Sequence, residues 1–175
     1  ECLERWHVSQ ARWSLRCVTC KHGYTGAAAF RLGRSFWDQV RTREETDRER
    51  LSAATELAVV LEAQGEFSEA ARIHRETLEV RRRVLGAEHP STLTSANNLA
   101  SVLEAQGEFS EAARIHRETL EVRRRVLGAE HPDTLASANN LASVLEEQGE
   151  LVEAARMHRE TLEVQRRVLG AEHPV

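Results

Sequence analysis

The sequence predicts an all-α protein built from stacked antiparallel helix pairs. A block of 42 residues occurs three times with few changes, and the stretch from Val60 to Pro90 is identical to that from Val102 to Pro132. Within each block, apolar residues return at spacings of three and four, which is typical of a helix with one buried face. A period of this length favours a helical repeat, in which each unit buries its apolar face against its neighbours.

The repeats give the predicted division of the chain. We place repeat 1 at 49–90, repeat 2 at 91–132 and repeat 3 at 133–174, after a divergent N-terminal segment at 1–48. We interpret that segment as a degenerate repeat, and a leader that is not a repeat is the alternative. Since the chain does not begin with Met, we expect it to be a piece of a longer protein or an incomplete gene product.

Each copy is predicted to contain two helices, taken here from the second copy. The first lies near 91–105, and its apolar stripe consists of Leu93, Ala96, Leu99, Ala100 and Leu103. Gly107 is expected to take a positive φ, which allows a tight reversal into a second helix near 109–127 that ends at Gly128. We expect Ser91 to act as N-cap of the first helix, and Asp133 to do the same in the next copy.

Two recurring sets of charged or polar residues are expected to be structural. The arginines at 81–83 and 123–125 lie near a helix C-terminus, where the helix dipole favours positive charge. The histidines of the second helix, His74, His116 and His158, are interpreted as partly buried packing residues, and those of the loop are expected to fix its shape.

Composition limits the classes of partner. The net charge of −4 over 175 residues provides no basic field for nucleic acid. No stretch of about 20 apolar residues is present, so we expect no membrane partner. The three cysteines all lie near the start and cannot hold the repeats together, which makes a reducing compartment, the cytoplasm, the expected location.

The small and large positions of the block resemble the tetratricopeptide repeat. They are Leu99, Ala100, Gly107, Phe109, Ala112 and Leu120. The period, the loop at 127–135 and the run Ala96-Asn97-Asn98-Leu99-Ala100 are similar to the repeats of kinesin light chains, over about 49–174. The resemblance implies a right-handed α-solenoid and a non-catalytic scaffold or adaptor that binds a peptide segment in a concave groove. The partners it implies are a kinesin motor subunit or its cargo.

Two features depart from kinesin light chains. No heptads for pairing with a motor subunit are visible, and the first helix of each copy ends in glutamate where the family has basic groove positions. The alternative function is a structural or sensor repeat array within a larger signalling protein that contains a nucleotide switch.

The candidate binding residues lie on the first helix of each copy, opposite the apolar stripe. The resemblance places Asn98 and Asn140 at the family's groove asparagine, and an amide has the donors and the acceptor to pair with a peptide backbone. The predicted peptide-binding set is Asn97, Asn98, Ser101, Glu104, Asn139, Asn140, Ser143 and Glu146. The alternative is that these asparagines form helix-to-helix bonds between repeats.

Acidic residues recur at the end of each first helix, at Glu62, Glu104, Glu146 and Glu147. They form either an acidic rim that attracts a basic partner or a solvated face.

No catalytic motif is present, and we expect neither enzyme activity nor a cofactor. Cys2, His7, Cys17 and Cys20 supply four candidate zinc ligands, but their spacing matches no known finger, and cysteines that pack within helices are the alternative.

The last copy presents apolar residues with no following helix to cover them. They are Leu162, Val164, Val168 and Leu169. We expect this end either to be continued by more repeats or to self-associate.

Overall fold

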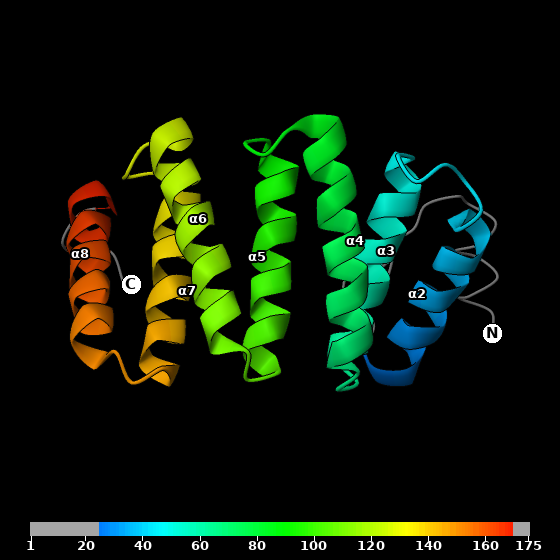
Figure 1. Ribbon diagram of the computed structural model, residues 1–175, viewed down its shortest axis with the longest axis horizontal. Coiled ribbons are helices and arrows are strands. Elements are labelled where there is room, and N and C mark those ends of the chain that lie inside the picture. Colours follow the sequence, from blue (N-terminus) through cyan, green and yellow to red (C-terminus); the bar gives the residue numbers. More distant parts are fainter. Residues whose placement is uncertain (1–24, 170–175) are drawn as a thin grey trace. The chain divides into compact units, whose positions relative to one another are not determined.

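All described secondary structure is helical. The computed structural model describes residues 25–169, and within them the chain forms seven helices and no strand (Figure 1). The helices are α2 (Gly26–Val40), α3 (Arg48–Glu62), α4 (Phe67–Leu85), α5 (Pro90–Ala105), α6 (Phe109–Leu127), α7 (Pro132–Glu147) and α8 (Leu151–Leu169). The prediction of an all-α array of helix pairs is confirmed, and the bounds of α5 and α6 match the predicted ones to within one residue.

The chain forms two compact units that divide after Val80. In the first, α2 packs against α3, which is followed by most of α4. In the second, α5 packs against α6, α6 against α7, and α7 against α8. The packed pairs are therefore neighbours along the chain, as expected for a repeat array.

Glycine turns make the helices of a pair antiparallel. Gly107 has a φ of 80° between α5 and α6, and Gly65 and Gly149 take nearly the same conformation in the other copies. The reversal is closed by the Glu108 amide, which donates to the Leu103 carbonyl at 2.9 Å. A side chain at position 107 would meet no neighbouring atom, so it is the backbone conformation that requires glycine there.

The prediction of the N-caps was wrong by two residues. His89 caps α5: its Nδ1 accepts a hydrogen bond from the Ser91 amide at 3.1 Å. His131 caps α7 in the same way, through the Asp133 amide at 3.1 Å. Because Pro90 and Pro132 occupy the first helical position, the cap must be the residue before the proline, and an imidazole nitrogen replaces the usual hydroxyl or carboxylate. The expectation that the loop histidines fix the shape of the loop is confirmed for these two.

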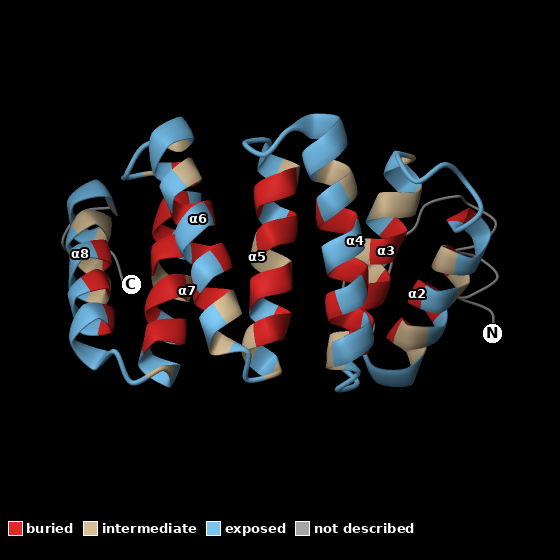
Figure 2. Ribbon diagram, in the orientation of Figure 1, coloured by how far each residue is buried: buried red, intermediate tan, exposed pale blue. Residues whose placement is uncertain are grey.

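The core follows the apolar stripe, and Figure 2 shows buried residues running along α5, α6 and α7. Ala100 and Ala112 have no exposed surface, which allows the backbones of α5 and α6 to approach closely. Leu103 on α5 and Leu145 on α7 are almost fully buried as well. Burial of each leucine contributes about 1.5–3 kcal/mol before the entropy of ordering is subtracted.

The first unit has a core of its own between α2 and α3. Phe36, Val40 and Ala53 are buried there, with Trp37 packed against them. The first helix of the proposed degenerate repeat falls outside the described residues.

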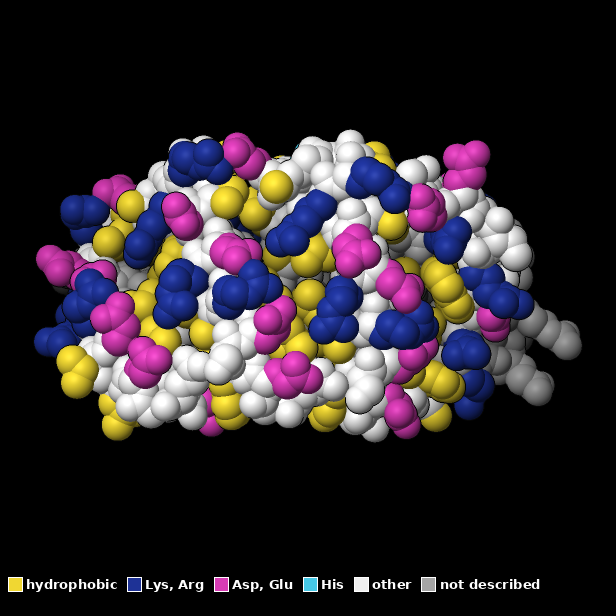
Figure 3. All heavy atoms as spheres, in the orientation of Figure 1, with side chains coloured by type: hydrophobic (Ala, Val, Ile, Leu, Met, Phe, Trp, Pro, Cys, Tyr) yellow, Lys and Arg dark blue, Asp and Glu magenta, His cyan; other side chains and the backbone are white. Residues whose placement is uncertain are grey.

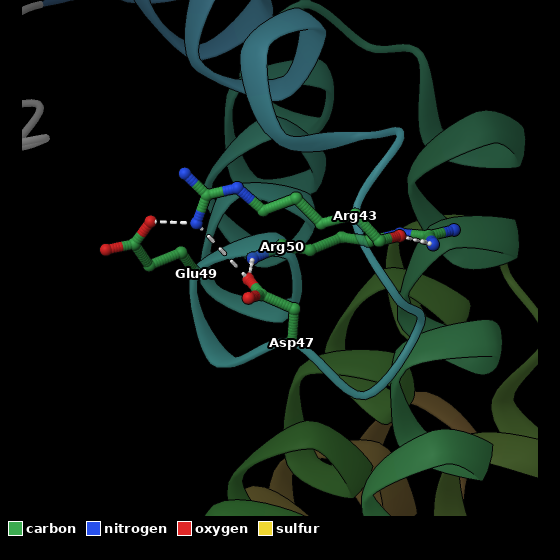
Figure 4. Close-up of polar contacts among 4 residues, drawn as sticks. All are labelled: Arg43, Asp47, Glu49 and Arg50. Atoms are coloured by element: carbon green, nitrogen blue, oxygen red, sulfur yellow. Dashed lines mark hydrogen bonds and ion pairs between the residues drawn. The ribbon is translucent and has the colours of Figure 1, made fainter.

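The loop before α3 is held by charged side chains, which Figure 4 shows in close-up. The Asp47 carboxylate caps α3 by accepting a hydrogen bond from the Arg50 amide at 2.9 Å. Arg43 pairs with Glu49, and its Nη1 lies 3.7 Å from Oδ1 of Asp47. The start of α3 is therefore fixed by a carboxylate cap, in contrast to the histidine caps of α5 and α7.

Candidate peptide-binding face

The structure places the predicted binding residues on α5 and α7 of the second unit. Asn97, Asn98, Ser101 and Glu104 lie on α5, and their counterparts Asn139, Asn140, Ser143 and Glu146 lie on α7. We call these eight residues the amide face. Its four asparagines are half-buried and its two serines are exposed, which leaves polar groups within reach of a ligand.

One hydrogen bond joins the two helices across this face. The Asn140 amide donates from Nδ2 to Oδ1 of Asn97 at 2.8 Å. The bond connects the second asparagine of α7 to the first asparagine of α5, so part of the predicted ladder has a structural role. It uses one donor of Asn140 and one acceptor site of Asn97, and an amide pair keeps further donors and acceptors beyond one such bond.

Two carboxylates meet at the end of the amide face. Burial raises the pKa of Glu104 on α5, and the nearby negative charge of Glu147 on α7 raises it further. Glu147 occupies the position that Ala105 has in the preceding copy. The second of the two neighbouring negative charges therefore comes from a residue that is particular to the last copy. A cation bound here would relieve the repulsion and gain from the partial burial.

The four acidic positions have different neighbours. Glu62, in the first unit, points to its own helix pair, where Oε1 lies 2.7 Å from Nε2 of buried His74. Glu146 lies 3.6 Å from Nε2 of His158. In the second unit, the acidic edge of the amide face is therefore centred on Glu104 and Glu147.

The recurring histidine has three environments. His74 is buried and bonded to Glu62, whereas His116 is fully buried and neither ring nitrogen has a hydrogen-bond partner. The His158 side chain is 38% exposed. The interpretation of this residue as packing is confirmed, and burial exceeds the expected degree for His74 and His116.

No metal site is found among residues 25–169: no group of three or more potential ligands lies close enough to hold an ion. The candidate ligands Cys2, His7, Cys17 and Cys20 lie outside the described residues. No helix of this part of the chain is long and apolar enough to cross a membrane.

The arginine triplets contain a contact that sequence reasoning missed. Arg123, which is buried, donates from Nη1 to Ser137 Oγ at 2.7 Å and to the Asp133 carbonyl at 3.0 Å, both on α7. Arg81 donates in the same way to Ser95 on α5. The sequence could have predicted these contacts, because residues 81 and 123 each lie three positions after a buried leucine and therefore on the same side of the helix.

Two hollows lie elsewhere on the second unit. One, of about 640 Å³, is bounded by the end of α4, α5 and α6, and contains the buried and unpartnered hydroxyl of Thr92. Another, of about 260 Å³, lies among α6, α7 and α8. Charges of both signs line them, and Figure 3 shows arginine and acidic side chains interspersed on the face that it draws.

Paired helices with a polar face on each first helix define a helical-repeat protein of the kind that binds other proteins. The tetratricopeptide repeat profile matches residues 49–125 and 97–167, which together are more than half of the chain. The chain belongs to the tetratricopeptide repeat family.

Solved structures extend this assignment. Two structures of a protein from Podosopora anserina, described as a kinesin light chain with nearly identical TPR-like repeats, are 26% identical to the chain and cover 84% of it. Their TM-scores are 0.71 and 0.70, over 77% and 78% of the respective chains. The predicted resemblance to kinesin light chain repeats is confirmed.

A third structure, BtubC (BKLC) from P. vanneervenii, shares the fold with a TM-score of 0.72 at 18% identity, over 85% of this chain and 60% of its own. No match was found among curated protein sequences.

Proposed function

We propose that the amide face binds an extended segment of a partner protein and that the protein works as a non-catalytic adaptor in the cytoplasm. The fold supports the general class, since tetratricopeptide repeats form protein-interaction scaffolds. The observation that carries the specific proposal is the row of half-buried amides on α5 and α7, which ends at two carboxylates.

The amides would hold the backbone of the segment. An extended peptide presents a carbonyl and an N–H at every residue, and an asparagine satisfies both kinds of group without selecting a side chain. Ser101 and Ser143 are exposed on the same face and add donors that rotate to suit the ligand.

The carboxylates would select a basic residue. Because burial and the negative charge of Glu147 both disfavour the charged form of Glu104, an arginine or lysine of the partner would find a site where its positive charge is favoured. We therefore propose a segment with at least one cationic side chain, in keeping with the glutamates that this chain has where kinesin light chains have basic groove positions.

The test begins with a displayed library of random peptides, which should become enriched in arginine and lysine when selected on the protein. A selected peptide is then measured by fluorescence anisotropy. Asn98→Ala should weaken its binding about tenfold, and the double change Glu104→Gln with Glu147→Gln should do the same and reduce the dependence on salt.

Glu121→Gln is the matched control, because it removes an exposed carboxylate from α6, at the hollows rather than on the amide face. Unchanged affinity in the Asn98 and Glu104/Glu147 variants would contradict the proposal. Weaker binding in the Glu121 variant would move the site from the amide face to the hollows.

We extend the proposal to the role of a kinesin light chain-like cargo adaptor, and the support is the likeness to the Podosopora anserina protein. In co-sedimentation with a purified kinesin motor subunit, the chain is expected to appear in the bound fraction. If it stays in the supernatant at all concentrations, the adaptor role is limited to other assemblies.

A further inference from the structure

The helix that opens repeat 1, α3, has a side that differs from the matching side of the helices that open the other repeats. Where α5 has Asn98 and Ser101, α3 has Glu56 and Val59, and α7 agrees with α5. Residues 56 and 59 are three apart and therefore share one side of the helix. On α3, a carboxylate and an apolar side chain thus replace an amide and a hydroxyl.

Glu56 is a half-buried carboxylate without a partner. Among residues 25–169, five carboxylates are not exposed. Three of them are held by a hydrogen bond or an ion pair, namely Asp47, Glu62 and Glu111. The other two, Glu104 of the amide face and Glu56, form neither kind of contact within this part of the chain. Glu56 therefore resembles the carboxylate to which we assign a cationic ligand.

The environment of Glu56 disfavours its negative charge. Burial raises the pKa of Glu56 above its ordinary value of 4.5, and burial is the whole cause, whereas Glu104 also has the charge of Glu147 nearby. A carboxylate that loses part of its water and gains no partner is destabilised in its charged form. A cation from a bound molecule would supply the missing interaction.

The neighbours of Glu56 on α3 are an apolar surface and a free hydroxyl. Val59, one turn after it, is 46% exposed. Ser52, one turn before it, is exposed and offers a hydroxyl oxygen as an acceptor. The Thr55 hydroxyl uses its hydrogen in a bond to the Leu51 carbonyl at 2.9 Å, so that hydrogen is not available to the carboxylate.

A lysine or arginine side chain has the two parts that fit this surface. Its aliphatic stem can lie on Val59, and its charged head can then reach Glu56 and Ser52. A hydrogen bond between a charged donor and a carboxylate is about twice as strong as one between neutral groups. An acidic side chain would be repelled here, and a neutral one would leave the charge of Glu56 without a counter-ion.

We propose that Ser52, Glu56 and Val59 bind a lysine or arginine side chain of a partner protein, and we call these three residues the α3 subsite. This inference rests on the proposed function for the kind of ligand, which is an extended protein segment. It adds a basic residue to those that the segment carries. Because the α3 subsite uses residues of the first unit alone, it can be tested separately from Glu104 and Glu147.

The first test removes the other cation site. A displayed library of random peptides is selected on the full 175-residue chain that carries Glu104→Gln and Glu147→Gln. We expect the selected peptides to be enriched in lysine and arginine, and we expect Glu56→Gln, added to the same chain, to abolish this enrichment. A double variant that selects no basic residues, or a triple variant that still selects them, would overturn the proposal.

The second test separates the charge from the stem. A peptide from that selection is measured by fluorescence anisotropy beside an analogue in which norleucine, an uncharged aliphatic residue, replaces the basic one. Glu56→Gln should weaken binding of the basic peptide about tenfold and leave the norleucine analogue unchanged. Equal weakening of both peptides would exclude a charge pair at Glu56.

Val59→Ser, which introduces the residue of α5 and α7, tests the apolar contact. It should weaken both peptides about threefold, because the stem loses its contact in either case. Full affinity in this variant would rule out Val59 as part of the α3 subsite.

Two measurements exclude a general effect. Glu79→Gln is the matched control, since Glu79 is an exposed carboxylate of α4 in the same unit, and it should leave the affinity unchanged. In urea unfolding, Glu56→Gln should not lower the midpoint, because it removes a charge that has no partner. A loss of affinity with Glu79→Gln as large as with Glu56→Gln, or a lowered midpoint, would refute the assignment.

The results also distinguish the two sites. If the Asn98 and Glu104/Glu147 variants keep full affinity while Glu56→Gln weakens binding, the amide face is refuted and the α3 subsite is supported. The reverse pattern would refute the α3 subsite and leave the amide face supported.

Discussion

Helices α6 and α8 have nearly the same sequence and different surroundings. They differ at four positions, yet α6 packs between α5 and α7, whereas α8 packs on α7 and is the last described helix. Ala113 and His116 are buried on α6, while Ala155 is exposed and His158 is partly exposed on α8. In a repeat array, burial is therefore decided by the neighbouring copy as much as by the residue.

The largest difference in stability between matching variants of α6 and α8 is expected when a bulky residue replaces the alanine that faces the next helix. Ala113→Trp should destabilise the protein by about 3 kcal/mol, because the indole does not fit between α6 and α7. Ala155→Trp should cost less than about 0.5 kcal/mol, because position 155 is exposed. Urea unfolding of both variants measures the difference, and equal losses would contradict the contrast between the helices.

Removal of the polar contact between copies should have the next largest effect. Arg123→Ala should lower the free energy of unfolding by about 2 kcal/mol, since two charge-assisted hydrogen bonds to α7 are lost. Gln165→Ala, the change at the matching position of α8, should cost less than about 0.5 kcal/mol in urea unfolding. If Arg123→Ala has no larger effect than Gln165→Ala, the contact contributes nothing to stability.

The buried histidine of α6 should make stability depend on pH. Burial of the ring, and to a smaller degree the positive charge of Arg123, lower the pKa of His116 to about 4 from an ordinary value of 6.5. Between these two values the unfolded chain binds a proton that the folded chain does not. The free energy of unfolding is therefore not reduced by this histidine above pH 6.5, and it falls as the pH drops from 6.5 toward 4.

This histidine should account for a loss of about 2 kcal/mol between pH 7.5 and pH 5. The measurement is urea unfolding at both pH values for the parent chain and for His116→Phe, which should lack this part of the loss. His158→Phe is the matched control at a partly exposed position and should retain it. Identical pH profiles for all three proteins would refute the assignment to His116.

The smallest effect is expected where the two helices have the same surroundings. Arg114 bridges Glu111 and Glu118 on α6, and Arg156 bridges Glu153 and Glu160 on α8, with arginine side chains 55% and 54% exposed. Replacing either arginine with alanine should have little effect on urea unfolding and the same effect on both helices, since exposed ion pairs are screened by water. A large difference between the two variants would show that the burial of neighbouring residues is not what distinguishes α6 from α8.

The helices could be predicted because the information is local. The stripe from Leu93 to Leu103 and the glycine at 107 give the bounds of α5 and the turn that follows. The N-caps were missed because Ser91 is a common cap by residue type, whereas the proline before it moves the helix start back to residue 90.

The candidate site could be predicted only in part, because its properties arise between copies. The helical wheel places Asn97 and Asn140 on one face, but the bond between them depends on how far α7 is shifted along α5. The raised pKa of Glu104 depends in part on Glu147 in the next copy. His74 and His116 lie in identical local sequence. Neither copy alone could therefore predict that His74 is bonded to Glu62 while the ring nitrogens of His116 have no hydrogen-bond partner.

The arginine contact between copies has a consequence for how such a gene changes. Arg81 meets Ser95 as Arg123 meets Ser137, so unequal recombination that deletes residues 91–132 would join Pro90 to Asp133 and bring Arg81 opposite Ser137. The same exchange in the other direction adds a copy at a junction that already fits. The number of 42-residue copies can therefore change in evolution, and no new pair of side chains is required where two copies are joined.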